Sequence, residues 1–280
     1  MVDVLVIGSV NLDLCASVSR LPEAGETVTG ASLSRFPGGK GANQALAAQR
    51  LGANVRLIAC VGDDAAAEEA LALLRDGGVD LAGVRVHADL ATGIALISVA
   101  LSGENQIVVA PGANAAMNPE SIEPGRTDAL ICQLEIPASV IARAAESFEG
   151  FFCANLAPAK EIDVTVLQRA DLVVVNETEA AWYGDTLVAC SGFIATTHGS
   201  RGAELRQGGT LIAEAKPPPV KAIDTVGAGD TFTAALTVAL VEGQEPVDAL
   251  KFACAAGAAA TTRQGAQPSL PTRQEVEAIL

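Results

Sequence analysis

The stretch DTVGAGDTFTAAL, residues 224–236, combines two glycines and two aspartates with the start of an alanine-rich segment. Gly227 and Gly229 permit backbone conformations that a Cβ forbids, and the N–H groups of Ala228, Gly229 and Asp230 then lie at the N-terminus of the following helix. Unpaired N–H groups and the helix dipole make such a terminus an anion hole. A carboxylate beside it repels a phosphate but can take a proton from a hydroxyl that attacks the phosphate. The pattern predicts Asp230 as a general base, although this residue could instead only cap the helix.

Four further polar stretches each follow an apolar run that predicts a strand. They are GSVNLD at 8–13, QLE at 133–135, NETE at 176–179 and THGSRG at 197–202. Ligands of open parallel sheets bind at the carboxyl ends of the strands, so we expect these stretches and DTVGAGD to form one site. Taken singly, Asn11 and Asp13 could be turn residues. Glu135 could likewise be a solvated strand end and Asn176 a helix cap, but their joint occurrence favours a site. Asp224 is expected to end a strand and suits a cation-binding or loop-holding role.

Short apolar runs alternate with helical segments along most of the chain. Runs such as VDVLVIGS, VRLIACVG and DLVVVNETE suit strands buried on both faces of a sheet, and DDAAAEEALALLRDGG and GDTFTAALTVALVEG suit helices between them. The alternation predicts an α/β fold with a doubly wound, mostly parallel sheet flanked by helices. Two segments, at about 12–36 and about 91–109, show strand-like alternation without intervening helices. They predict a small antiparallel flap, or lid, inserted into a single domain of residues 1–280.

The amino-acid composition indicates which materials can form the core and which classes of binding partner are disfavoured. Half of the residues are apolar, only 3% are aromatic and the formal net charge is −15, so the core must be built from Ala, Val, Leu and Ile. An acidic surface argues against a general affinity for nucleic acid or anionic membranes. No uninterrupted apolar stretch reaches the roughly 18 residues of a membrane span. Six cysteines without a C-x-x-C pair, and an N-terminus that reads as a core strand, predict buried thiols in a cytoplasmic protein.

Several common nucleotide-binding and catalytic motifs are missing from the sequence. There is no G-x-x-x-x-G-K-[ST] loop, which excludes a P-loop NTPase, and GSVNLD lacks the spacing of a dinucleotide fingerprint, which weighs against a Rossmann dehydrogenase. The two histidines, His87 and His198, are not paired in the sequence. A histidine metal site and a Ser–His–Asp triad are therefore disfavoured.

The chain resembles the ribokinase-like (PfkB-type) carbohydrate kinases in five motifs that occur in order: GGKGANQA, NETE, THGSRG, DTVGAGDTF and RQGAQPS. The resemblance covers nearly the whole chain, and GSVNLD, GETVTG, QLE and GAQPS narrow it to the members that phosphorylate ribose. It implies transfer of a phosphoryl group from ATP to the 5-hydroxyl of D-ribose, with Mg²⁺ accompanying ATP and K⁺ as an activating cation. A related kinase of deoxyribose, fructose or a nucleoside remains an alternative, as does a sugar or nucleotide sensor without catalysis. Pairing of two lids across a two-fold axis would protect their exposed strand edges, so we expect a homodimer.

The resemblance also implies a role for each matching residue. The sugar-binding set is Asn11, Asp13, Gly39, Lys40, Gly41, Asn43, Glu135 and Asp230. The catalytic set is Gly227, Ala228 and Gly229, which form the anion hole, and the base Asp230. The ATP-binding set is Asn176, Thr197, His198, Gly199, Ser200, Arg201, Gly202, Gly229 and Cys254, with Glu179 acting indirectly on Mg²⁺. The set implied for a monovalent cation is Asp224, Val226, Ala260, Arg263, Gly265 and Ser269, several of them through backbone carbonyls.

The chain departs from the family pattern in four places. The segment WYGDTLVACSGF after NETE is short, which predicts that a peripheral helix is missing or reduced. Cys254 replaces a residue that is often His or Asn near the adenine. His198 stands where an apolar residue is commoner, and NLAPA at 155–159 replaces the usual NPAPA.

Overall fold

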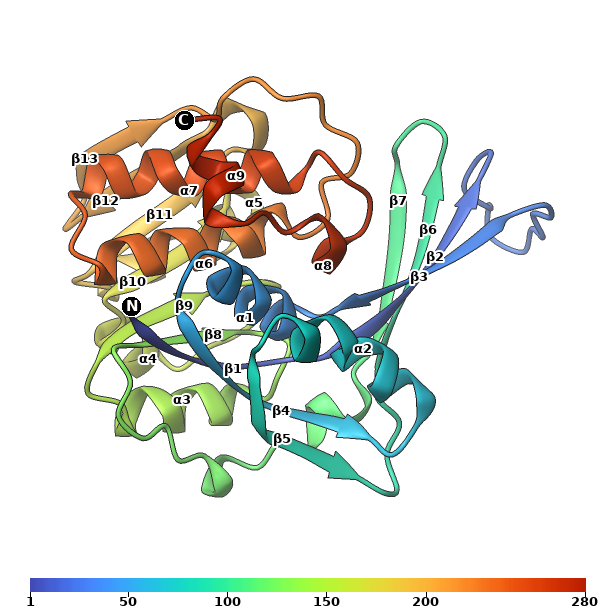
Figure 1. The fold of residues 1–280 in the computed structure, drawn as a ribbon, viewed down its shortest axis with the longest axis horizontal. Helices are drawn as coiled ribbons and strands as arrows, with labels where there is room; N and C mark the ends of the chain where they lie inside the picture. The colour runs from blue at the N-terminus through green and yellow to red at the C-terminus, as the bar shows by residue number, and fades with distance from the viewer.

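A nine-stranded sheet forms the centre of the protein (Figure 1). The computed structural model describes all 280 residues, and the strands of this sheet lie in the order β13-β12-β11-β10-β9-β8-β1-β4-β5. Neighbouring strands from β11 to β5 run parallel, whereas β12 and β13 add an antiparallel hairpin at one edge. The predicted α/β class with a mostly parallel sheet is confirmed. The strands are β1 (Asp3–Ile7), β4 (Asn54–Gly62), β5 (Asp80–His87), β8 (Ala129–Gln133), β9 (Phe151–Asn155), β10 (Leu172–Asn176), β11 (Phe193–Thr197), β12 (Ala203–Gln207) and β13 (Thr210–Ala215).

Helices cover both faces of this sheet, because its central strands are apolar on both sides. In β1, Val4 and Val6 belong to the core shared with α1, α2, α6 and α7, whereas Leu5 and Ile7 belong to the core shared with α3 and α4. None of the helices combines the length and the apolar character needed to cross a membrane. The helices are α1 (Lys40–Arg50), α2 (Ala65–Asp76), α3 (Ala138–Ser147), α4 (Val164–Arg169), α5 (Glu177–Tyr183), α6 (Ala228–Val241), α7 (Pro246–Ala260), α8 (Ala266–Ser269) and α9 (Arg273–Glu277).

A second sheet of four strands, in the order β3-β2-β6-β7, projects from the end of the main sheet (Figure 1). Its strands are β2 (Asn11–Val18), β3 (Ser32–Gly38), β6 (Gly93–Ala100) and β7 (Asn105–Ala110). The β2–β3 and β6–β7 pairs are antiparallel, as the sequence predicts, but the central pair β2–β6 is parallel. Each pair begins at the same end of the parallel strands of the main sheet, because β2 follows β1 and β6 follows β5. Strands β2 and β6 therefore run in the same direction. We call this sheet the lid.

The segment before Asp224 differs from the prediction. No strand lies between β13 and α6, so Asp224 lies in a loop and not at a strand end. Three consecutive prolines at 217–219 lack the N–H groups that a sheet ladder requires. The connection after NETE is short, as expected, because α5 ends at Tyr183 and a 3-10 helix (Gly184–Ala189) leads towards β11. All six cysteines are free thiols, and all but Cys15 are buried.

Helix α1 packs directly against the chain that follows β1. Gly41 lies so close to this chain that a Cβ would come within 2.5 Å of the carbonyl carbon of Gly8 and the nitrogen of Ser9. Gly39, immediately before the helix, has a φ of 88°, and a Cβ there would come within 2.7 Å of the nitrogen of Asn11. The glycines of GGKGAN therefore allow the N-terminus of α1 to lie on the loop between β1 and β2.

Replacing Gly41 with alanine should lower the free energy of unfolding by about 1–3 kcal/mol, the usual cost of forcing an extra carbon into a packed site. The obstructing atoms belong to backbone, which cannot rotate away. Gly77→Ala is the matched control, because there the nearest atom is Leu46 Cδ1, the end of a flexible side chain, at 2.5 Å. Urea unfolding of both variants measures the difference, and equal losses would contradict this account.

Candidate active site

The site lies where the strand order changes direction. The chain runs from β1 outward through β4 and β5 and then returns to β8 on the other side of β1, and open α/β sheets bind ligands at such a switch point. Ser9 Oγ, after β1, donates to Glu135 Oε2, after β8, at 2.5 Å. The backbone N–H of Lys40 donates to the same oxygen at 3.0 Å, and that of Gly41 donates to Ser9 Oγ at 3.3 Å. Both strand ends and the N-terminus of α1 are therefore joined at one point.

Asn11 and Asp13 lie at the base of the lid, on β2, and both are buried. Asn114 Nδ2 donates to Asn11 Oδ1 at 2.8 Å, and Asn114 Oδ1 accepts from the backbone N–H of Val10 at 3.0 Å. These bonds fix the orientation of the Asn11 amide, whose nitrogen stays available for a ligand. The carboxylate of Asp13 lies over Gly38, where a Cβ would come within 2.3 Å of Asp13 Oδ2. The lid thus carries two polar side chains into the site.

Asp230 lies in the first turn of α6 and is only 6% exposed. Both of its carboxylate oxygens accept hydrogen bonds from α1. Asn43 Nδ2 donates to Oδ2 at 2.9 Å, and Gln44 Nε2 donates to Oδ1 at 3.0 Å. Asn43 Oδ1 is buried and has no partner in the protein. The site therefore holds an oriented carboxylate with an unused hydrogen-bond acceptor beside it.

The N-terminus of α6 presents unpaired donors next to this carboxylate. Gly227 is the N-cap and adopts a left-handed conformation with a φ of 81°. The backbone N–H groups of Gly229 and Asp230 have no acceptor in the protein, and that of Ala228 reaches Thr225 O only at 3.3 Å. No atom lies within 4 Å of a Cβ placed on Gly229, so the space in front of the terminus is open. Such a terminus can bind an anion.

Several ionisable groups share this small volume. Burial alone would lower the pKa of Lys40, but the carboxylates of Asp230, Glu135 and Glu179 more than compensate and raise it. Burial raises the pKa of Asp230, opposed by the charge of Lys40. Burial also raises the pKa of Glu179. Burial, with the charges of Glu135 and Asp230, raises the pKa of Asp13 to about 7. The site therefore favours protons or cations near its carboxylates.

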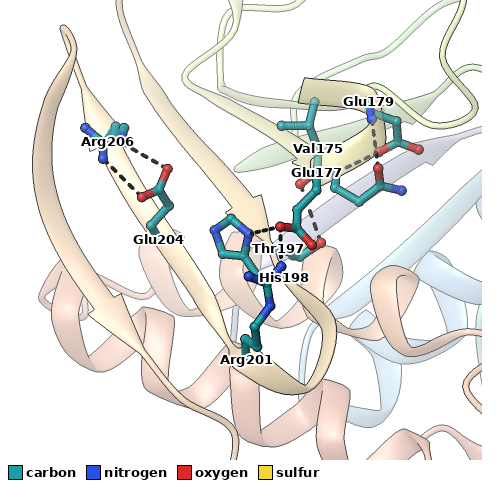
Figure 2. Close-up of polar contacts among 9 residues, drawn as sticks. Val175, Glu177, Glu179, Thr197, His198, Arg201, Glu204 and Arg206 are labelled. Carbon is teal, nitrogen blue, oxygen red and sulfur yellow. Dashed lines mark hydrogen bonds and ion pairs between the residues drawn. The ribbon is translucent and has the colours of Figure 1, made fainter. Parts of the chain in front are cut away.

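The N-x-x-E motif caps helix α5 (Figure 2). Asn176 Oδ1 accepts from the Glu179 N–H, and Glu179 Oε2 accepts from the Asn176 N–H, both at 2.8 Å, which is a reciprocal capping box. Asn176 is thus a helix cap, and Glu179 is held buried with one carboxylate oxygen uncommitted. The single tryptophan, Trp182, lies on the same helix, 53% exposed, with its ring centre 4.7 Å from that of Tyr183.

Figure 2 shows Glu177 of α5 beside His198 and Arg201, which follow β11. Arg201 forms an ion pair with Glu177 Oε1, and His198 Nδ1 lies 3.2 Å from the same oxygen without hydrogen-bond geometry. The Arg201 side chain is 70% exposed, so the pair adds little to stability. It does bring the N-x-x-E helix next to the THGSRG loop. The pair of Glu204 and Arg206 lies further along β12.

Helix α7 meets the THGSRG loop at the end of β13. Gly202 has a φ of 106°, and a Cβ there would come within 2.0 Å of Ala215 O. Cys254 Sγ lies 3.6 Å from the same carbonyl oxygen. Thr197 ends β11, and a 3-10 helix (Gly199–Arg201) connects it to Gly202. The residues predicted to bind the nucleotide therefore line one edge, formed by the ends of β10 and β11 and by α7.

Asp224 ties the loop before α6 to the loop before α8. Its Oδ1 accepts from the Val226 N–H at 3.0 Å, and its Oδ2 accepts from the Gly265 N–H at 2.9 Å. The carbonyl oxygens of Val226, Ala260 and Arg263 accept no hydrogen bond in the protein. Hard cations prefer oxygen ligands of this kind, so the donors fit such an ion. Ser269, the last residue of this predicted set, ends α8 and accepts a 3.4 Å contact from the Arg263 side chain at its carbonyl oxygen.

The side chains of the protein do not form a complete set of ligands for a divalent cation. No three His, Cys, Asp or Glu side chains gather closely enough to hold a metal ion. Glu179 can supply one carboxylate oxygen, directly or through water. This single ligand suits Mg²⁺, which keeps several waters and is bound mostly by substrate phosphates in many enzymes.

Four residues of the site were not singled out from the sequence: Ser9, Gln44, Asn114 and Asn155. Each contacts a predicted residue or completes a chain of bonds to one. Gln44 and Ser9 lie inside quoted motifs, GGKGANQA and GSVNLD, so the motifs were a usable signal. Asn155 lies inside NLAPA, to which no role was assigned from the sequence, and Asn114 alone lies outside every motif, in the 3-10 helix Gly112–Ala116 after the lid.

Comparison with known proteins identifies the family. Residues 1–273 match the pfkB family of carbohydrate kinases. The chain belongs to this family. It is therefore a phosphotransferase that acts on a hydroxyl group of a sugar.

Ribokinases are among the proteins most similar to this kinase. Ribokinase of Bacillus subtilis is 37% identical over 296 residues, with all of both chains covered. A crystal structure of ribokinase from Thermotoga maritima has a TM-score of 0.90 at 32% identity and covers 100% of this chain and 99% of that one. A structure of Arabidopsis thaliana ribokinase complexed with ribose and ATP has a TM-score of 0.89 at 29% identity, covering 99% and 98%.

The burial of Asp13 should make the stability of the sugar-free kinase depend on pH. Its pKa of about 7 exceeds the ordinary value of 3.8, so the folded protein holds this proton more tightly than the unfolded chain. The stabilisation by that proton is complete below about pH 4 and is lost as the pH rises through about 7. Asp13→Asn should therefore be more stable than the wild type at about pH 8, by up to about 4 kcal/mol, and similar to it at about pH 4.

Urea unfolding at the two pH values tests this expectation, with the exposed Asp76→Asn as the control for loss of one negative charge. An Asp13→Asn variant that gains no stability over the wild type at the higher pH would contradict it.

Proposed function

We propose that this kinase transfers the γ-phosphoryl group of ATP to the 5-hydroxyl of D-ribose, giving D-ribose 5-phosphate and ADP. The observation that carries the proposal is the oriented carboxylate of Asp230, which lies beside the unpaired N–H groups at the start of α6. The choice of sugar is supported by the ribokinase of Bacillus subtilis and by the Arabidopsis ribokinase that was solved with ribose and ATP.

The sugar is proposed to lie beneath the lid, between β2 and the N-terminus of α1. Asn11 and Asp13 reach it from the lid, and Asn43 Oδ1 offers a buried acceptor that the protein leaves unpaired. An unpaired buried acceptor destabilises the free protein and favours a ligand hydroxyl that completes it. Glu135 closes the pocket from the end of β8. Gly39, Lys40 and Gly41 complete the proposed sugar-binding set along the start of α1.

In the reaction, Asp230 takes the proton of the 5-hydroxyl as its oxygen attacks the γ-phosphorus in line. The bond from phosphorus to the bridging oxygen of ADP breaks, and ADP leaves. The N–H groups of Ala228, Gly229 and Asp230 are proposed to stabilise the negative charge on the transferred group, with Gly227 shaping the turn. Closure of the lid excludes water, which would otherwise accept the phosphoryl group.

ATP is proposed to lie along the edge formed by Asn176, residues 197–202 and Cys254. A divalent cation accompanies the nucleotide in a kinase. We assign Mg²⁺ to this role, with Glu179 as the protein group that orders it through water, and it would neutralise phosphate charge. We assign K⁺ to the loops around Asp224, where it would fix the turn that leads into Gly227.

Residues 1–280 are proposed to act as one domain, with the lid strands inserted at about 12–36 and 91–109.

We also propose that the protein is located in the cytoplasm, because its six cysteines are free thiols and a reducing compartment keeps thiols in this state.

Asp230→Asn should lower kcat by about 100- to 10,000-fold, the usual contribution of a general base, while KM for ribose stays close to the wild-type value. ADP release from ATP and Mg²⁺ measures both constants, with Asp248→Asn on the surface of α7 as the control. Ribose-dependent turnover should also rise when K⁺ replaces a large organic cation.

The acceptor is tested with a panel of pentoses, hexoses and nucleosides. Turnover with another acceptor but not with ribose would support the kinase activity and identify that acceptor as the substrate. Full turnover of Asp230→Asn with ribose would show that another group takes the proton.

A homodimer through the lid is proposed for the assembled enzyme. Strand residues that pair in register share a face of the sheet, and Leu96 pairs with Leu14 and with Val108. This face is opposite to that of Asp13, so it points away from the site. Leu33 lies on the same outer face, and Leu33, Leu96 and Val108 are each half or more exposed. Such a face, on a sheet with open edges at β3 and β7, suits pairing with a second copy.

Sedimentation velocity at micromolar protein should give twice the 28.3 kDa mass of one chain. The double variant Leu96→Glu and Val108→Glu should sediment as a monomer, because it buries charge in the proposed interface. Val188→Glu, at an 82% exposed valine outside the lid, should remain dimeric. A monomeric wild type would defeat the proposal.

A further inference from the structure

Gln44 connects the proposed base to the middle of the sheet. Its Nε2 atom donates twice, to Asp230 Oδ1 at 3.0 Å and to Asn155 Oδ1 at 3.0 Å. Asn155, at the end of β9, in turn donates from Nδ2 to the backbone carbonyl of Val174 in β10 at 3.2 Å. Gln44 is fully buried and Asn155 is nearly so. A continuous chain of hydrogen bonds therefore runs from a core strand to the carboxylate.

The direction of this chain is fixed at its far end. The carbonyl of Val174 can only accept, so Asn155 must turn its nitrogen towards Val174 and its oxygen towards Gln44. That oxygen can only accept as well, so Gln44 must present its nitrogen. An amide nitrogen carries two hydrogens, and the second one points at Asp230. The opposite orientation of Gln44 would place its oxygen against two other oxygens.

Gln44 Oε1 is buried without a partner. An unpaired buried acceptor is unfavourable for folding, and Gln133 and Gln267 carry the same cost. Gln44 differs from these two glutamines because its Nε2 atom donates to Asp230.

We propose that Gln44 is a positioning residue for the base, which with Asn155 keeps Asp230 oriented and ionised so that it can accept the proton of the sugar hydroxyl. This inference rests on the assignment of Asp230 as the base. It gives a role to Gln44 of GGKGANQA and to Asn155 of NLAPA, and it adds a direction imposed by the backbone of β10.

The hydrogen bond acts against the burial of Asp230. A donor to the charged form of a carboxylate lowers its pKa, and burial raises it here. Four other ionisable groups face Asp230: Asp13 of β2, Lys40 of α1, Glu135 after β8 and Glu179 of α5. None of their side chains forms a hydrogen bond with Gln44, whose amide nitrogen donates only to Asn155 and Asp230, and all four remain in the variants below.

The test is the pH profile of kcat with saturating ribose and MgATP. In the acid limb of this profile, kcat falls because Asp230 becomes protonated. Gln44→Met keeps the length of the side chain but removes the donor that favours ionised Asp230, so the acid limb should move to higher pH by about one unit. At a pH below the limb this lowers kcat by about tenfold, whereas KM for ribose should change little. Asn155→Leu frees Gln44 to rotate, so it should move the limb in the same direction by a smaller amount.

Gln133→Met is the matched control. Gln133 is also buried at a strand end, donates to the Ile7 carbonyl at 3.2 Å and leaves its Oε1 unpaired. It makes no bond to Asp230, so its loss should lower stability without moving the acid limb.

An acid limb that stays at the wild-type pH in folded Gln44→Met and Asn155→Leu, while Asp230→Asn is inactive, would overturn this inference and leave the base in place. If Gln44→Met does not fold, Asn155→Leu decides alone. An active Asp230→Asn would instead overturn the base assignment, and the inference with it.

Discussion

The burial of several carboxylates close to one another is the constraint on which the site depends. Asp13, Glu179 and Asp230 are each more than nine-tenths buried, and each ionised carboxylate in such a medium disfavours ionisation of the others. Lys40 and the N–H groups of two helix N-termini offset part of this cost. The remainder is left for ligands, because a cation or a hydroxyl donor stabilises the cluster where the protein does not. The free enzyme is thus less stable than an apolar core of the same size would make it.

The fold meets this constraint by bringing two helix N-termini together on one face of the main sheet. Helix α1 starts at the switch point between β1 and β8, and α6 starts beside it, and the two helices pack along their length. Small residues make this possible. Gly39 and Gly41 let α1 lie on the chain after β1, and Gly227 shapes the turn into α6. Partial positive charge from both helices therefore falls on the same small volume that holds the acidic side chains.

The sequence predicted the parts of this arrangement that depend on local pattern. Apolar runs predicted the strands of the α/β class, and the glycines around Asp230 predicted the helix that begins there with unpaired N–H groups. The partners of these residues depend on tertiary structure and could not be read from the sequence. Asn155 joins the site because β9 lies between β8 and β10, and Asn114 does so because a loop after the lid returns to β1.

The errors of prediction have the same origin. A strand was expected to end at Asp224, but the chain between β13 and α6 forms a loop, and β13 already occupies that edge of the sheet. The parallel pairing of β2 with β6 follows from the direction in which two distant segments leave the main sheet, which no local pattern records. The helix cap predicted as one role of Asn176 is present in the structure and also holds Glu179.

The placement of the single tryptophan gives the molecule a built-in optical probe. Trp182 is half-exposed on the short helix that carries Glu179, with the edge of Tyr183 as its aromatic neighbour. The Tyr183 hydroxyl is anchored in turn to the Lys160 backbone at 2.7 Å. Indole emission therefore reports from one known place, near the edge proposed to bind the nucleotide and outside the lid. The Lys160 ammonium donates in turn to the carbonyl oxygen of Leu134 at 2.7 Å, beside Glu135, so this fluorophore is joined to the far side of the proposed site by a short chain of hydrogen bonds.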